Sequence, residues 1–364
     1  MPADPHISGV AVSVYTVPTD APESDGTLQW DSTTMVLVRL QAAGQSGLGF
    51  TYGHRASALI VDELFRPLLV GRSAFDIRGL WQAMRRAARN IGAGGVVAHA
   101  LSAVDVALWD LKARLLGVGL ADLLGAARAA VPAYGSGGFT SYSIDELRAQ
   151  LGGWAADGLP WVKMKVGRQP MADPERVAEA RDAIGPDTGL MVDANGAYAR
   201  KQALWAAQWF AEQAVGWFEE PVPAADVAGL RLLRDRLPAG MEVAAGEYGY
   251  DAATFRGLLR GGAVDVLQAD ATRCGGLTGF LAVAALADAF NLPLSAHTAP
   301  SIHLPVCLAC ANVRHIEYFH DHARLEHLLF DGAARPEKGL LRPDLERPGL
   351  GLTLKAGDAE RYAA

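Results

Sequence analysis

Three acidic residues are spaced as candidate metal ligands. Asp193 and Glu219 each directly follow a short apolar run, and Glu247 lies two residues beyond another. Three carboxylates brought together repel one another and raise one another's pKa unless a cation lies between them. Oxygen-only ligation suits Mg²⁺, or alternatively Mn²⁺, and leaves positions for water or substrate. The alternative is that these carboxylates form salt bridges with neighbouring lysines.

Two lysines lie two residues apart in an apolar stretch. Lys163 and Lys165 are flanked by Val162 and Val166, and residues at this spacing in a strand point to the same side. If both point into the fold, we expect mutual repulsion and a nearby metal to lower their pKa values, which favours one as a general base. The alternative is a pair of surface lysines at a strand end.

A carboxylate and an imidazole follow two further apolar runs. Asp270 and His297 are candidates for an acid–base pair, because a carboxylate beside an imidazole orients the ring and supports its protonated form. Glu317 lies at the end of the next run. The other histidines of this region are interpreted as structural or peripheral: His303, His315, His320 and His322.

The elements that must position these side chains are eight short apolar runs, separated mostly by helical patterns such as 174–184 and 201–213. This alternation predicts the α/β class and a closed (β/α) barrel, of the modified TIM type, in which all strand C-termini meet at one face. An open doubly wound sheet is the alternative, disfavoured because no Gly-rich turn follows the first strand. The runs are 131–134, 162–166, 189–192, 215–218, 242–245, 264–267, 292–295 and 315–318.

The first part of the chain has a different pattern. Residues 6–15 and 35–40 alternate apolar and polar side chains, which predicts antiparallel strands. A polar loop is expected over 19–31, a turn over 49–54, and a helix over 97–116 that ends at Gly117. We therefore divide the chain into an α+β domain (1–128), a barrel (129–339) and a tail (340–364) that packs back on the first domain.

Composition limits the partners. The 364-residue chain has a formal net charge of −7 and no basic run, which argues against nucleic-acid binding. Three cysteines are too few for a disulfide framework and suit a reducing cytoplasm. The start lacks a basic signal-peptide region, and the most apolar helical stretch, 277–290, is too short to span a membrane. We expect a cytoplasmic homo-oligomer that acts on a small molecule.

The motifs together resemble the mandelate racemase subgroup of the enolase superfamily, over nearly the whole chain. The resemblance implies a capping domain built from both chain ends over a barrel. It implies Mg²⁺ held by Asp193, Glu219 and Glu247, with Lys165 as a base on one face of the substrate and the His297–Asp270 dyad on the other. Glu317 matches the family's acid that hydrogen-bonds a substrate carboxylate oxygen. The motifs are 102–110, Val162-Lys-Met-Lys-Val-Gly167, Val192-Asp-Ala-Asn195, Trp217-Phe-Glu-Glu-Pro221, Ala245-Gly-Glu247, Gln268-Ala-Asp270, Gly275-Gly276 and His297.

The implied chemistry is removal of a proton alpha to a carboxylate through an enediolate, a pattern known for this superfamily. The metal and Lys163 can neutralise charge that develops on the carboxylate oxygens. Glu317 can help only if it is kept protonated, which requires a raised pKa.

The outcome after proton removal depends on the substrate. Polar loops at 19–20, 23–27 and 51–54 suit a polyhydroxy acid, so we favour dehydration of an acid sugar to a 2-keto-3-deoxy acid, with a racemase or epimerase of a 2-hydroxy acid as the alternative. Two further hypotheses come from other functional classes: a Schiff-base aldolase and a non-catalytic sugar-binding barrel. The expected substrate contacts are Asn195, Tyr52, His54 and Asp20.

Overall fold

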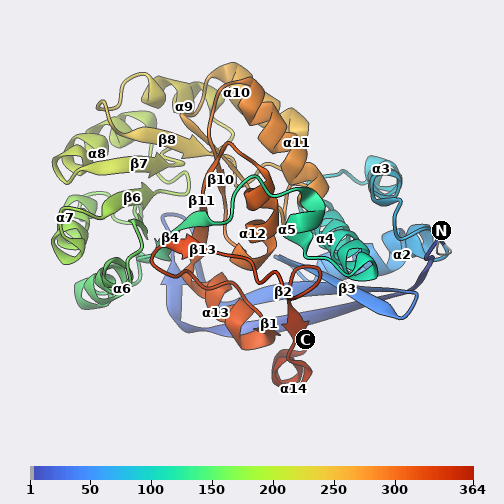
Figure 1. The fold of residues 1–364 in the computed structure, drawn as a ribbon. Coiled ribbons are helices and arrows are strands. Elements are labelled where there is room, and N and C mark those ends of the chain that lie inside the picture. The colour runs from blue at the N-terminus through green and yellow to red at the C-terminus, as the bar shows by residue number, and fades with distance from the viewer. Residues whose placement is uncertain (1–3) are drawn as a thin grey trace.

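Eight parallel strands form a closed barrel, and they coincide with the eight apolar runs to within a few residues. The structure, a computed structural model, describes residues 4–364. The strands lie side by side in chain order, and β11 pairs with β4 to close the ring (Figure 1). They are β4 (Val131–Gly137), β5 (Trp161–Lys165), β6 (Gly189–Asp193), β7 (Val215–Glu219), β8 (Glu242–Ala245), β9 (Val266–Ala269), β10 (Leu294–Ala296) and β11 (Val313–Phe319). The predicted fold class is confirmed.

A helix follows each barrel strand and covers the outside of the barrel. Small and apolar residues on one face of each helix contact the strands, as Ala203, Ala207 and Phe210 do on α8. None of the helices within residues 4–364 is long and apolar enough to cross a membrane. The covering helices are α6 (Ile144–Ala156), α7 (Asp173–Ile184), α8 (Arg200–Glu212), α9 (Val227–Arg234), α10 (Ala252–Gly261), α11 (Gly276–Ala289), α12 (Pro300–Ala309) and α13 (His320–Leu329).

The barrel interior is filled by side chains in layers. A separate apolar cluster that includes Tyr134, Met191 and Trp217 occupies the interior. Asp193 and Glu219 each lie two residues beyond a member of this layer, so their side chains point inward as well, one layer closer to the barrel mouth. The alternation of a strand therefore places the acidic residues above a closed apolar floor.

The cap consists of a three-stranded antiparallel sheet and a set of helices. The long helix α4 begins and ends within one residue of the predicted helix, and Gly117 ends it in a left-handed conformation at φ 70°. The sheet lies very close to α4, because a Cβ at Gly47 would be 2.4 Å from the Leu111 nitrogen. The elements are β1 (Ile7–Ser24), β2 (Gln29–Ala42), β3 (Gln45–Tyr52), α1 (Ala56–Leu59), η1 (Ile60–Phe65), α2 (Arg66–Leu69), α3 (Ile77–Ala87), η2 (Ala88–Asn90), α4 (Val96–Leu116) and α5 (Leu120–Leu124).

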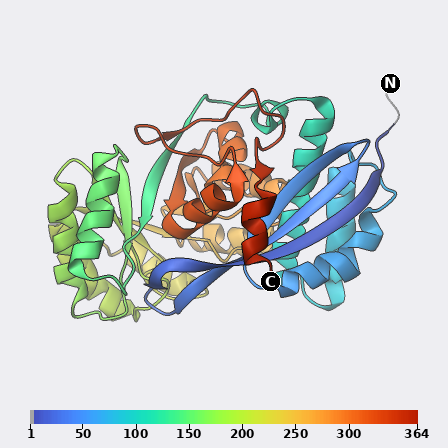
Figure 2. The same cartoon turned by 90° about the horizontal axis from the view of Figure 1, so that it is seen from below.

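Two loop predictions in the cap are wrong. Most of the polar segment 19–31 continues β1 and β2 as a two-stranded ribbon, in which Glu23 pairs with Trp30, and it runs from the cap to the barrel (Figure 2). The turn expected over 49–54 is the end of β3, which reaches Tyr52. A ribbon outside the sheet has little apolar alternation, so its composition resembles a loop. Only the tip turns, where Asp25 Oδ1 accepts hydrogen bonds from the Thr27 and Leu28 nitrogens.

The C-terminal tail contacts both the barrel and the cap. The Ala364 nitrogen donates to the Val14 oxygen on β1 of the cap, and Leu340 and Leu341 pair with Pro132 and Val131 at the start of barrel strand β4. One apolar core runs through cap and barrel. Because this core is shared, packing does not separate the two parts at residue 128, and the predicted domain boundary there stays a prediction. The remaining elements are β12 (Phe330–Asp331), β13 (Leu340–Leu341), β14 (Thr353–Leu354), α14 (Ala356–Ala359) and η3 (Glu360–Tyr362).

Asp110 holds α4, the cap sheet and the tail together, and we expect Asp110→Ala to destabilise the fold by about 3–5 kcal/mol. Its buried carboxylate accepts hydrogen bonds from the nitrogens of Leu48 and Leu350, each at 2.7 Å, and pairs with Arg114. The substitution leaves these buried donors without an acceptor. The measurement is urea unfolding. The matched control is Asp62→Ala, since the exposed pair with Arg66 has the same spacing and should contribute less than about 1 kcal/mol. Equal losses would contradict this account.

Candidate active site at the barrel mouth

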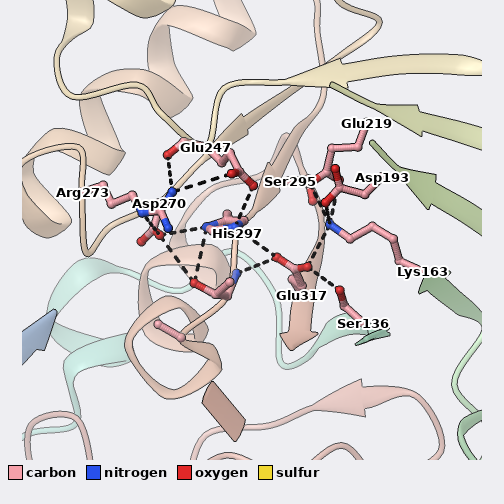
Figure 3. Close-up of polar contacts among 12 residues, drawn as sticks. Ser136, Lys163, Asp193, Glu219, Glu247, Asp270, Arg273, Ser295, His297 and Glu317 are labelled. Atoms are coloured by element: carbon pink, nitrogen blue, oxygen red, sulfur yellow. Dashed lines mark hydrogen bonds and ion pairs between the residues drawn. The ribbon is translucent and has the colours of Figure 1, made fainter. Parts of the chain in front are cut away.

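Three carboxylates from consecutive strands meet at the mouth of the barrel. Asp193 ends β6 and Glu219 ends β7 beside it in register, while Glu247 follows β8. All three are buried, and one oxygen of each lies within 4.8 Å of the others. Gly246 makes the third position possible, because its φ is 135° and a Cβ there would lie 2.1 Å from the Gln268 oxygen. The predicted cluster is therefore assembled (Figure 3).

The chemistry of this cluster fits a divalent cation. Burial, followed by repulsion from Asp193, raises the pKa of Glu219 to about 8. Next to the cluster, Glu220 Oε1 and Asn195 Oδ1 are buried without a hydrogen-bond partner among residues 4–364. An all-oxygen set of this kind suits Mg²⁺ or Mn²⁺, whose charge would offset the repulsion.

The two lysines point into the same cluster from β5. Lys163 Nζ donates to both oxygens of Glu219, at 2.7 and 2.8 Å, and Lys165 Nζ donates to Asp193 Oδ2 at 2.5 Å. The prediction that the two lysines have lowered pKa values is wrong when only the protein's own charged groups act on them. Burial lowers the pKa of Lys165, but Asp193 and other carboxylates raise it by more, so the net shift is upward, and the pKa of Lys163 rises likewise. The salt bridges considered as the alternative are thus present.

The imidazole of His297 lies between two carboxylates. Its Nδ1 is 2.9 Å from Asp270 Oδ2, and its Nε2 is 2.9 Å from Glu247 Oε2 (Figure 3). Burial lowers the pKa of His297, but Glu247 and then Glu317 outweigh burial and raise it to about 10. His297 follows β10 and Lys165 ends β5, so the two groups reach the acidic cluster from different sides of the barrel.

Glu317 lies on β11 between the lysine and histidine sides of the site. Its Oε1 accepts hydrogen bonds from Ser136 Oγ at 2.6 Å and Lys163 Nζ at 2.8 Å, and its Oε2 accepts one from the Thr298 nitrogen. The raised pKa predicted for Glu317 is not found when only the protein's own charged groups act on it. Burial raises the pKa of Glu317, but Lys163, followed by His297 and Lys165, lowers it to about 2. The nearby ammonium and imidazole stabilise the ionised carboxylate by more than burial destabilises it.

A cavity of about 330 Å³ lies between the barrel mouth and the cap. Asn195 and Tyr52, both expected to contact substrate, line it. His54 and Asp20 do not line it, so a substrate contact by either residue stays a prediction. His54 Nδ1 instead accepts a hydrogen bond from the Ala56 nitrogen at the start of α1, and Asp20 pairs with His320. The site residues at the cavity wall are Lys165, Glu247, His297 and Glu317.

Several pocket residues were missed by sequence reasoning. Arg273 lies three residues beyond Asp270, with its Nε 3.4 Å from Asp270 Oδ2, and this short spacing was a usable signal. His322 was interpreted as peripheral, but it stacks on Tyr52 with ring centroids 3.5 Å apart. No sequence signal identifies His99, which reaches the pocket from α4. The other missed wall residues are Leu28, Trp30, Ser32, Thr33, Thr34, Tyr248, Thr298 and Phe319.

Fold and site define a cap-and-barrel enzyme with an acidic site at the barrel mouth. Residues 10–125 match the mandelate racemase / muconate lactonizing enzyme N-terminal domain, and residues 146–359 match the enolase C-terminal domain-like family. The chain therefore belongs to the mandelate racemase / muconate lactonizing enzyme family of the enolase superfamily, which confirms the resemblance.

Proteins similar to this chain include enzymes that catalyse different reactions. The chain is 34% identical to 3,6-anhydro-alpha-L-galactonate cycloisomerase of Streptomyces coelicolor, over 88% of this chain and 89% of that protein. A mandelate racemase/muconate lactonizing enzyme-like protein from Rubrobacter xylanophilus has a TM-score of 0.97 at 56% identity, covering 99% of this chain and 100% of that one. L-talarate/galactarate dehydratase from Salmonella typhimurium, crystallised with Mg and L-lyxarohydroxamate, has a TM-score of 0.90 at 28% identity, covering 100% and 94%.

Proposed function

We propose that this enzyme uses Mg²⁺ to remove the proton alpha to the carboxylate of an acid sugar, and that loss of the β-hydroxyl then gives a 2-keto-3-deoxy acid. The observation that carries the proposal is the placement of two groups able to exchange protons, Lys165 and His297, on different sides of one acidic cluster in one cavity. The Salmonella relative crystallised with Mg and an acid-sugar hydroxamate supports the same chemistry.

Asp193, Glu219 and Glu247 would hold the cation, which when bound supplies positive charge for the substrate carboxylate as it becomes an enediolate. Lys163 adds a second fixed positive charge beside this position, since its ammonium is fully buried among carboxylates. Such preorganised charge acts where negative charge develops in the transition state.

Lys165 is assigned as the base on one face, and His297 as the proton-exchanging group on the other. Lys165 acts as a base only when neutral, so the local charge balance must change when cation and substrate bind. Asp270 holds the Nδ1 side of His297, which leaves Nε2 directed toward the acidic cluster and the substrate position. From there His297 can give a proton to a departing β-hydroxyl.

The cap wall of the cavity supports a hydroxylated substrate. Asp25 at the tip of the β1–β2 ribbon and Ser32, Thr33 and Thr34 of β2 face the cavity, although the residues first expected there, Asp20 and His54, do not. A fully apolar substrate would displace water from these polar groups without replacing its hydrogen bonds, which is unfavourable. Distal hydroxyls would satisfy them, and a missing hydroxyl would be discriminated against.

Racemisation or epimerisation of a 2-hydroxy acid is the alternative. It uses the same pair, Lys165 and His297, and returns the proton on the opposite face instead of expelling a hydroxyl. The cycloisomerase relative shows that one family member supports a different outcome on the same fold.

A semicarbazide assay across mono- and diacid sugars tests the proposal. We expect 2-keto acid from at least one sugar, and none from Glu219→Gln, which serves as the control for contaminating activity. The physical reason is that elimination forms an enol that tautomerises to the keto acid. No keto product from any sugar, together with a change in optical rotation of a 2-hydroxy acid, would select the racemase.

A further inference from the structure

A second cluster of ligand-type side chains lies outside the catalytic cavity, where the β1–β2 ribbon meets the barrel. Asp20 and Glu23 come from β1, and His320 begins α13. One ligand atom of each lies within 4.8 Å of the others, and His320 Nε2 is 2.9 Å from Asp20 Oδ2. Glu23 is fully buried whereas Asp20 is exposed, so the cluster is open to solvent on one side.

Glu23 lacks a partner that its burial requires. Its Oε2 accepts a hydrogen bond from Trp30 Nε1 at 2.7 Å, but the buried Oε1 has no hydrogen-bond partner within residues 4–364. A buried polar atom without a hydrogen-bond partner destabilises the fold, so we expect a bound group to contact it.

The charges around Glu23 further destabilise its ionised form. Burial, then Asp321 and Asp20, raises the pKa of Glu23 to about 8. Arg324 is the nearby cation, but its Nη2 already donates to Asp321 Oδ1 and to the Pro18 oxygen. The cluster formed by these groups therefore carries excess negative charge beside one imidazole nitrogen.

We propose that Asp20, Glu23 and His320 form a second divalent-cation site. One imidazole and two carboxylates favour Zn²⁺, Mn²⁺ or Fe²⁺ over Mg²⁺, which prefers oxygen-only ligands. The open side leaves positions for water. The site is independent of the proposed function, because it shares no residue with Asp193, Glu219 and Glu247.

The consequence is a link between the cap and the barrel. The cation joins β1 to the start of α13, and Glu23 holds the indole of Trp30, which lines the catalytic cavity. The second cation thereby fixes one wall of the substrate cavity from outside.

Mn²⁺ binding followed by electron paramagnetic resonance tests this site. In the wild-type protein we expect two Mn²⁺ per chain, and one when excess Mg²⁺ occupies the all-oxygen site. His320→Asn should bind one Mn²⁺, and none with excess Mg²⁺. The matched control is His54→Asn, which removes a histidine outside both clusters and should keep two.

A second variant keeps the test informative if His320→Asn does not fold. Asp20→Asn changes a side chain that is 48% exposed and should weaken the Mg²⁺-resistant Mn²⁺ by at least about tenfold, since removal of even an outer-shell partner costs 10–100-fold. The absence of Mg²⁺-resistant Mn²⁺ in the wild type, or Mg²⁺-resistant Mn²⁺ that is unaffected by His320→Asn and Asp20→Asn, would overturn the proposal.

Discussion

Removal of the catalytic cation should abolish turnover, and Glu219→Gln should do the same without a chelator. The Glu219 carboxylate lies at the centre of the acidic cluster, fully buried, with Lys163 and Trp217 Nε1 as donors. The amide keeps the size of the side chain but lacks its charge. We expect kcat to fall by at least about 10²–10³-fold, as for loss of one preorganised electrostatic group, and we expect Mg²⁺ to restore EDTA-treated wild-type enzyme but not the variant.

Ligand-linked stability gives a readout besides activity. At a Mg²⁺ concentration 100-fold above its Kd, bound Mg²⁺ should raise the free energy of unfolding of the wild type by about 2.7 kcal/mol, and the same concentration should raise that of Glu219→Gln far less. The matched control is Glu242→Gln. Glu242 begins β8 at the opposite end of the barrel and pairs with Arg314. Full activity after EDTA treatment, or equal Mg²⁺ effects in both variants, would contradict this assignment of ligands.

Replacement of either group proposed to exchange protons should lower kcat by about 10²–10⁴-fold, the range typical of general acid–base catalysis. Lys165→Ala removes the ammonium beside Asp193, and His297→Asn removes the imidazole between Asp270 and Glu247. The measurement is steady-state kinetics on the sugar identified by the keto-acid assay. The matched control for the lysine is Lys201→Ala, on the exposed surface of α8, which should keep wild-type kcat.

Isotope exchange separates the two roles. The proton alpha to the carboxylate should exchange with solvent deuterium in one of the two variants and not in the other, because each group serves one face of the substrate. Exchange at the wild-type rate in both variants would exclude Lys165 and His297 as the groups that remove this proton.

The barrel and the acidic cluster could be predicted from sequence because their causes are local. Each strand appears as a short apolar run, and each acidic residue stands at the end of such a run. Closure of a barrel brings all these ends to one face whatever the details of packing. Asp193, Glu219 and Glu247 therefore meet as expected.

The pocket wall depended on tertiary structure. Segment 19–31 has the composition of a loop, yet it pairs as a ribbon because β1 and β2 continue past the cap sheet. His99 and His322 reach the cavity from α4 and α13, at positions that no strand-end pattern marks. Which side chains reach a cavity depends on how the cap docks on the barrel, and that contact joins segments far apart in the chain.

The protonation preferences of the site were also decided by tertiary structure. From sequence, the two lysines were expected to lower each other's pKa, and Glu317 was expected to have a raised one. In the fold, Lys163 lies within 3.6 Å of oxygens of Asp193, Glu219 and Glu317, and these attractions reverse both shifts. A pKa depends on the distances to every nearby charge. Chain spacing determines which charges meet at the barrel mouth, and only the folded geometry determines how close each pair lies.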